Sequence, residues 1–198
     1  MQNYRKWDFL VFTLLTLLAV LNGQTTVFYI IYFFWWNELA RIIIDTFMYK
    51  RNPNAKQDGK RMLLLAPLGQ MFIYFVFIVV FFGFMLNWDN THITMINIQV
   101  LGFNNWFFNL NLLFVIAERI YIHKTHQPVD VSLGIFTPPM IVLHVSIIVG
   151  GVLMFFVVKN FPDTFTPNNL WGSVIIILPF LGFKMLMNWW MEPVKKVY

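Results

Sequence analysis

The sequence predicts an all-α, polytopic integral membrane protein with six transmembrane helices and both termini in the cytoplasm. Of its 198 residues, 59% are hydrophobic and only 12% are charged. Soluble domains are about one quarter charged, so this composition indicates a chain that folds in lipid. Apolar stretches recur from end to end with only short polar connections between them. We therefore expect a single transmembrane domain over residues 1–198.

A membrane-spanning helix needs about 20 mostly apolar residues. The apolar stretches predict spans at about 7–23, 27–48, 62–87, 95–121, 137–158 and 170–191. Turn-forming Asn, Gly, Pro and Asp mark the connections, as in NGQTT and RNPNAKQDGKR. The first stretch follows the basic NYRK but precedes no A-x-A cleavage pattern, so we expect a retained helix rather than a signal peptide.

The placement of Lys and Arg predicts the orientation. With a cytoplasmic N-terminus, only Lys159 falls on the outer side. The inner side then holds Arg5, Lys6, Lys50, Arg51, Lys56, Lys60, Arg61, Arg119, Lys124, Lys195 and Lys196. This asymmetry follows the positive-inside rule, so the net charge of +5 does not call for nucleic acid. We expect the basic loop 50–61 to face anionic lipid headgroups.

The second predicted helix carries three charged residues in an apolar run. Glu38, Arg41 and Asp45 are spaced i, i+3 and i+7, which places them within about 60° on one helix face. Ionisable residues inside a span normally face the protein interior. Glu38 and Arg41 are also close enough in sequence to pair with each other. We therefore expect this face to point into the helix bundle.

Polar residues on five predicted helices lie at a similar depth. At 1.5 Å per residue, each lies about 10–15 Å from the cytoplasmic end of its helix. They are Glu38, Arg41, Gln70, Asn111, His144 and Lys184. Their common depth predicts a polar layer in the inner half of the membrane, as a network or as a cavity open to the cytoplasm. This layer is the candidate binding site.

Most of these residues also have an ordinary structural interpretation. Lys184 and Arg41 can snorkel to the inner surface, and His144 can be a hydrogen-bonded packing residue. Asp45 and Glu118 lie near the interface, where we expect them to be solvated. Glu38 is the deepest acid and too short to snorkel, which favours a specific buried role.

Small and amide side chains predict helix packing. The fourth helix contains GFNNWFFNLN, whose Asn104, Asn105, Asn109 and Asn111 are expected mainly to join helices by hydrogen bonds, with solute contact as the alternative. In the fifth helix, Ser146, Gly150 and Gly151 permit close backbone approach. We expect these three residues to serve packing.

The sequence also excludes several kinds of chemistry. It contains no Cys, no P-loop, no G-x-S-x-G and no H-E-x-x-H motif. His123 and His126 are close in sequence, but they are expected in a basic loop without a clear carboxylate partner. We therefore expect no cofactor and no metal.

The stretch MIVLHVSIIVGGVLM, followed by LPFLGFKMLMNWW, resembles the C-terminal half of an uncharacterised prokaryotic membrane family, domain of unknown function 6498. The resemblance comprises an L-H-x-[ST]-x-x-x-G-G helix, a following helix with an L-x-x-L-K-like core and an aromatic-Trp-x-Glu element. These motifs match His144, Gly150, Gly151 and Lys184, together with Trp35, Trp36 and Glu38. The family commonly has a His in a middle helix, whereas GQMFIYFVFIVVFFGFML has none. The resemblance covers about half of the chain. It implies a multi-pass protein of a prokaryotic cytoplasmic membrane and no particular reaction.

Three functional classes remain open from the sequence. The polar layer favours transport of a small solute or an ion, with Glu38 titrating and Arg41, His144 and Lys184 as its partners. The small size and the many apolar aromatic residues favour a non-catalytic subunit of a larger membrane assembly, with a protein partner or a second copy of the chain. An intramembrane enzyme or lipid-binding protein is the third class, and the sequence gives an enzyme the least support.

Overall fold

The computed structural model describes residues 2–48, 64–125, 135–161, 163–165 and 169–190. The regular structure in these ranges is entirely helical, which confirms the all-α class. The α-helices are α1 (Gln2–Leu21), α2 (Val27–Met48), α3 (Leu65–Phe77), α4 (Thr91–Leu101), α5 (Trp106–Thr125), α6 (Pro138–Leu153) and α7 (Leu170–Trp190). The predicted lipid-facing loop 50–61 lies outside the described residues.

Two of these helices continue in a different helical form. α3 passes into the π-helix η1 (Ile78–Phe84) and the short 3₁₀-helix η2 (Met85–Asn87). α6 passes into the π-helix η3 (Met154–Val158). η1 and η3 touch each other where the rings of Phe81 and Phe155 lie 5.8 Å apart.

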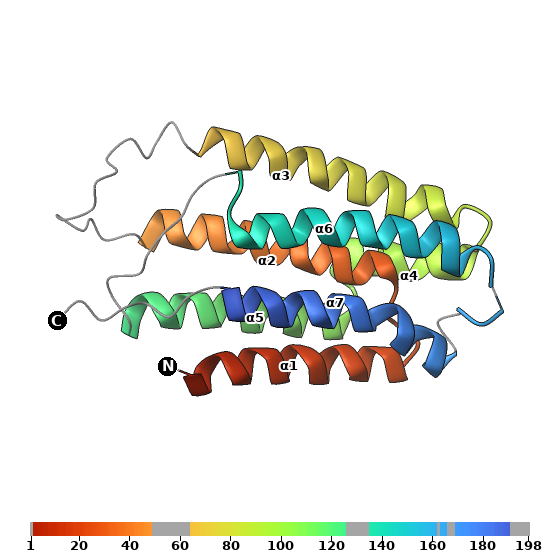
Figure 1. The fold of residues 1–198 in the computed structure, drawn as a ribbon, viewed down its shortest axis with the longest axis horizontal. Helices are drawn as coiled ribbons and strands as arrows, with labels where there is room; N and C mark the ends of the chain where they lie inside the picture. The colour runs from red at the N-terminus through yellow and green to blue at the C-terminus, as the bar shows by residue number, and fades with distance from the viewer. Residues whose placement is uncertain (1, 49–63, 126–134, 162, 166–168, 191–198) are drawn as a thin grey trace.

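The helices form a bundle of roughly antiparallel rods (Figure 1). α1, α3 and α6 run in one direction, whereas α2, α7 and the α4–α5 pair run in the other. α2 is the central rod and contacts α3, α4, α5, α6 and α7, while α1 packs against α5 and α7. Polar side chains on α2 can therefore reach most of the bundle.

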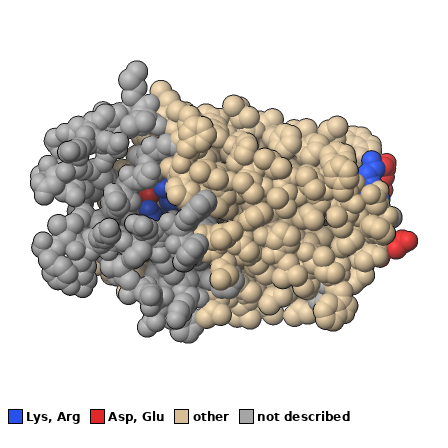
Figure 2. Space-filling model, in the orientation of Figure 1, with Lys and Arg blue, Asp and Glu red and all other residues tan. Residues whose placement is uncertain are grey.

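Four helical segments are long and apolar enough to cross a membrane: Val27–Met48, Leu65–Asn87, Thr91–Thr125 and Pro138–Val158. Within the described part, Leu10–Leu21 and Trp171–Leu186 are shorter apolar helices. Figure 2 shows that charged side chains on the visible face gather at the two ends of the bundle and leave its middle uncharged. This distribution fits a protein that lies in a bilayer.

The fourth predicted segment, 95–121, is not one continuous helix. It is interrupted between α4 and α5, where Phe103 has a positive φ of 57°. Asn105 Oδ1 accepts a hydrogen bond from Phe108 N at 3.0 Å and so caps the start of α5. Asn109 Nδ2 donates to Phe103 O at 2.6 Å within the break. The expectation that Asn109 mainly joins helices is therefore corrected, because its bond lies within the interruption. Asn105 does both, since its Nδ2 also lies 3.4 Å from Gln24 Oε1 in the connection between α1 and α2.

Aromatic rings fill the core around α2. Tyr32 stacks on Trp35 and on Phe108, with ring centroids 5.9 and 5.5 Å apart. Phe12 of α1 stacks on Phe33 at 4.9 Å. Each such pair contributes about 0.5–1.5 kcal/mol beyond the burial of its surface. The aromatic run of α2 thus contacts both α1 and α5, which also contact each other.

Candidate functional site

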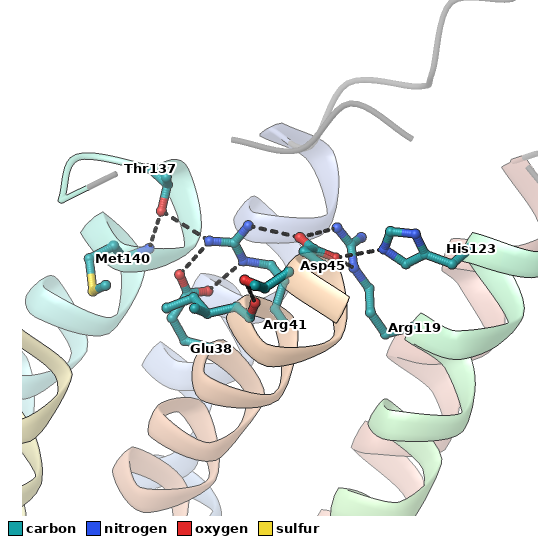
Figure 3. A network of polar contacts seen from close by, with 9 residues as sticks. Glu38, Arg41, Asp45, Arg119, His123, Thr137 and Met140 are labelled. Atoms are coloured by element: carbon teal, nitrogen blue, oxygen red, sulfur yellow. Dashed lines mark hydrogen bonds and ion pairs between the residues drawn. The ribbon is translucent and has the colours of Figure 1, made fainter. Parts of the chain in front are cut away.

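The charged residues of α2 lie in a compact network with α5 and α6 (Figure 3). Glu38, Arg41 and Asp45 follow one another along the last turns of α2. Arg119 and His123 approach from α5, and Thr137 approaches from the start of α6. The sequence places these six residues in three segments, and the bundle joins them at one end.

Arg41 links the two carboxylates of its own helix. Its Nη2 and Nε atoms lie 2.6 and 2.9 Å from the two carboxylate oxygens of Glu38, which is a bidentate pair. Its Nη1 atom lies 3.3 Å from Asp45 Oδ2. Glu38 and Arg41 are 3% and 11% exposed at the side chain. The guanidinium is thus shared between two acids, with the shorter contacts to Glu38.

Asp45 is the most heavily paired member of the network. Arg119 Nε and Nη2 each lie 2.6 Å from its carboxylate oxygens, and His123 Nε2 lies 2.8 Å from Oδ1. A carboxylate only accepts hydrogen bonds, so His123 Nε2 carries the shared proton. The prediction that Asp45 is solvated is wrong, because its side chain is 0% exposed. Arg119 and His123 lie 74 and 78 residues away in the sequence but contact Asp45 directly, which explains how an acid can be buried there.

His123 was expected in a loop without a carboxylate partner, and the structure corrects this. α5 extends to Thr125, so His123 lies in its last turn and is 2% exposed. Arg119 and His123 are spaced i and i+4, which places both on the face of α5 that meets α2. That spacing was the available sequence signal, and nothing in the sequence tied it to Asp45.

Thr137 connects the network to α6. Its hydroxyl oxygen accepts a hydrogen bond from Met140 N at 3.4 Å and caps the helix. The same oxygen lies 3.4 Å from Arg41 Nη2. The position of the Arg41 guanidinium is therefore coupled to the first turn of α6.

A pocket of about 60 Å³ lies beside the network. Its polar lining consists of Asn37, Glu38, Arg41, Glu118, Arg119 and Lys184. Lys184 of α7 is 2% exposed, and its ammonium lies 5.6 Å from the ring centroid of Phe12. Glu118 lines the same pocket and is half-buried, so its side chain keeps part of the solvent exposure that was expected. The pocket has room for a small polar group or a few water molecules.

The six residues of the predicted polar layer occupy three places. Glu38, Arg41 and Lys184 line the pocket described above. Asn111 Nδ2 donates to Tyr29 Oη at 3.1 Å in the buried interface between α5 and α2. Gln70 and His144 meet through Tyr74 at the outer surface of α3 and α6. The structure thus brings three of the six together and separates the others.

The residues expected to serve packing differ in their surroundings. A Cβ atom at Gly150 would collide with Ile31 Cδ1, so α6 approaches α2 closely at this point. A Cβ atom at Gly151 would meet nothing within 4 Å. Ser146 is fully buried, and its hydroxyl has no hydrogen-bond partner among the described residues.

Comparisons of this chain with protein-family models, with curated proteins and with solved structures find no match. The functional argument therefore depends on the geometry of the chain itself.

Proposed function

We propose that this chain is a six-span protein of a cytoplasmic membrane, with both termini inside, that transports a small solute or an ion coupled to protons. The alternating directions of the helices support six crossings (Figure 1). The four long apolar helices support a membrane location, and the proposal assigns the two further spans to the shorter apolar stretches in α1 and α7. The excess of Lys and Arg at the end where α2 and α5 finish supports a cytoplasmic orientation for that end.

One observation carries the transport proposal: a buried cluster of acids and bases borders a polar pocket in an otherwise apolar bundle. Ionisable groups at such depth are costly and normally mark ion or proton pathways. Glu38 is the proposed titrating group, because it lines the pocket and, among the described residues, Arg41 is its one cationic partner.

A coupling step follows from the shared position of Arg41. When Glu38 takes up a proton, its attraction for the guanidinium falls, and Arg41 moves toward Asp45 Oδ2, at present 3.3 Å away. This movement withdraws Arg41 from Thr137, which caps α6. Protonation at the pocket would in this way change the contact between α2 and α6.

A specific observation also favours the second candidate, a non-catalytic subunit of a membrane assembly. Asp45 is paired with Arg41, Arg119 and His123. Buried charges that are paired in this way can fix helix packing without any further role. In that case Glu38 would belong to the same structural unit and would not titrate in function.

Proton flux into proteoliposomes tests the proposal. The full chain is reconstituted with a trapped pH-sensitive dye, and a potassium diffusion potential is applied. We expect wild-type vesicles to acidify faster than empty vesicles and Glu38→Gln vesicles to match the empty ones. Asp89→Asn is the matched control, because Asp89 is an exposed acid just before α4 and should leave the flux unchanged.

Two results would contradict this function. Wild-type vesicles that never exceed empty ones, across a panel of added amino acids and inorganic ions, would remove the support for coupled transport. Equal flux in wild type and Glu38→Gln would remove Glu38 from the mechanism. Stoichiometric copurification of a second membrane protein, together with no flux, would favour the subunit candidate.

A further inference from the structure

A second polar group lies outside the charged network, on the outer surface between α3 and α6. Gln70 Nε2 lies 2.6 Å from Tyr74 Oη, and Tyr74 Oη lies 2.6 Å from His144 Nδ1. The Tyr74 and His144 rings are 5.7 Å apart. Gln70 and Tyr74 are half-buried, whereas His144 is exposed on the apolar exterior. A polar chain that ends on an exposed His in this position needs an explanation.

The direction of the hydrogen bonds determines what His144 presents. The Gln70 amide nitrogen can only donate, so Tyr74 Oη accepts its hydrogen. Among the described residues, His144 Nδ1 is the one acceptor within reach of the Tyr74 hydroxyl hydrogen, so Tyr74 Oη donates to it. A neutral imidazole that accepts at Nδ1 carries its proton at Nε2. His144 Nε2 has no hydrogen-bond partner among the described residues, so the chain ends in a donor that requires an acceptor from outside.

The surface beyond His144 is apolar and follows one face of α6 and η3. Ile148, Gly151 and Phe155 lie at i+4, i+7 and i+11 from His144, and Ile148 and Phe155 are 53% and 44% exposed. Space at Gly151 is open for at least 4 Å around a Cβ position. From His144 to Phe155 the face is about 16 Å long. This length is close to half of the roughly 30 Å hydrocarbon core, which is the thickness of one leaflet.

His144 lies near the end of α6 that adjoins the charged network. It follows Pro138 by six residues, or about 9 Å along the helix. Helical side chains lean toward the N-terminus of their helix, so the imidazole leans back toward that membrane surface. The donor therefore points toward the depth at which lipid ester and phosphate oxygens begin.

We propose that the α3–α6 face binds one glycerophospholipid from the leaflet at this end of the bundle. His144 Nε2–H donates to a phosphate or ester oxygen, and one acyl chain lies along Ile148, Gly151 and Phe155. The hydrogen-bond donor matches the polar headgroup of a lipid, and the apolar face, which is as long as one leaflet is thick, matches its acyl chain. A partner helix would instead cover apolar surface through both leaflets and would have to supply its own acceptor at His144.

Native mass spectrometry with added phosphatidylglycerol tests the site. The full-length chain is purified in mild detergent, and the occupancy of the tightest lipid is measured as a function of lipid concentration. We expect His144→Leu to weaken this binding about tenfold, as expected for the loss of one hydrogen bond. His92→Leu is the matched control, since it removes an exposed His from the first turn of α4 without touching the face.

A second variant tests the apolar half of the site. Gly151→Leu fills the space for the acyl chain but leaves the Gln70–Tyr74–His144 chain intact, and it should weaken the same binding while the protein keeps its melting temperature. Equal losses in His144→Leu and His92→Leu would overturn the site, as would a wild-type chain that retains no lipid. So would a wild-type dimer that His144→Leu and Gly151→Leu dissociate without loss of lipid, because the face would then bind a second copy.

Discussion

The two ends of α2 are attached to the bundle by different chemistry. At the C-terminal end, the Asp45 carboxylate binds Arg119 and His123 of α5 through contacts of 2.6 to 2.8 Å. At the N-terminal end, Thr26 uses neutral contacts: its hydroxyl donates to Asn97 Oδ1 at 2.7 Å and accepts from Tyr29 N at 3.1 Å. One helix thus has an ionic attachment and an amide–hydroxyl attachment.

The neutral end also reaches further into the backbone. Asn97 Nδ2 donates to Gly83 O at 3.0 Å and to Phe82 O at 3.3 Å, at the end of the π-helix η1. A π-helix disturbs the regular hydrogen-bond ladder, and Asn97 satisfies carbonyls near its end. Asn97 therefore joins α2, η1 and α4 without any formal charge.

The comparison teaches that similar burial carries very different costs. Asp45 is 0% exposed and Asn97 is 1% exposed, so both attachments are inside the protein. Removing one member of a buried ionic network leaves uncompensated charge, whereas removing a neutral partner leaves only unsatisfied dipoles. The ionic end of α2 should therefore lose more stability than the neutral end when one partner is removed. Its acidic groups can also change charge, which the neutral end cannot do.

Asp45→Ala should give the largest effect on stability. It leaves the side chains of Arg119 and Arg41 without their common carboxylate, and we expect a loss of about 3–5 kcal/mol in the free energy of unfolding. Thermal melting of the detergent-solubilised protein measures the loss, with the exposed acid variant Asp89→Ala as its control. A loss below about 1 kcal/mol would mean that the ionic end does not hold α2, contrary to the comparison.

A double-mutant cycle on Glu38 and Arg41 should give the next largest effect. We expect Glu38→Gln and Arg41→Gln each to destabilise the protein and the double variant to recover about 1–3 kcal/mol of their summed loss, because the two side chains form a bidentate pair. Melting curves of all four proteins give the coupling. Strictly additive losses would show that the pair is not an energetic unit, and the proposed shift of Arg41 would lose its basis.

Asn97→Leu should lower the free energy of unfolding by about 1–2 kcal/mol. Leu has a similar volume but makes no hydrogen bond, so the Gly83 carbonyl loses its donor and the Thr26 hydroxyl loses its acceptor. The measurement is the same melting experiment, with the exposed His92→Leu variant testing for the general effect of a new Leu near this end. A loss equal to that of Asp45→Ala would remove the difference between the two ends of α2.

The sequence predicts some of these features and misses others for physical reasons. The largely apolar stretch predicted a helix over 27–48, and α2 occupies Val27–Met48. The i, i+3, i+7 spacing likewise predicted one charged face on α2, which the network occupies. These features depend on local periodicity, which a single sequence contains.

The missed features depend on distant contacts or on a local signal that was given another meaning. Asp45 meets Arg119 and His123 across 74 and 78 residues, and only the packing of α5 on α2 brings them together. The GFNN stretch combines a Gly with Asn residues, which are typical of helix ends, yet the apolar residues around it favoured a continuous span. A polar residue in an apolar stretch can thus bind a neighbouring helix, as Asp45 does, or mark the end of a helix, as the GFNN stretch does.

The aromatic run of α2, which includes Tyr29, should be the least sensitive to loss of a polar group. The Tyr29 hydroxyl accepts one hydrogen bond from Asn111 at 3.1 Å, and such bonds between membrane helices average about 0.6 kcal/mol. We therefore expect Tyr29→Phe to lower stability by about that amount. Tyr29→Ala should cost about 3–5 kcal/mol, because it also removes the ring that packs edge-on against Phe108. If the two variants melted at the same temperature, the hydrogen bond and not the aromatic ring would hold this part of α2, and the contrast between the polar attachments and the aromatic run would fail.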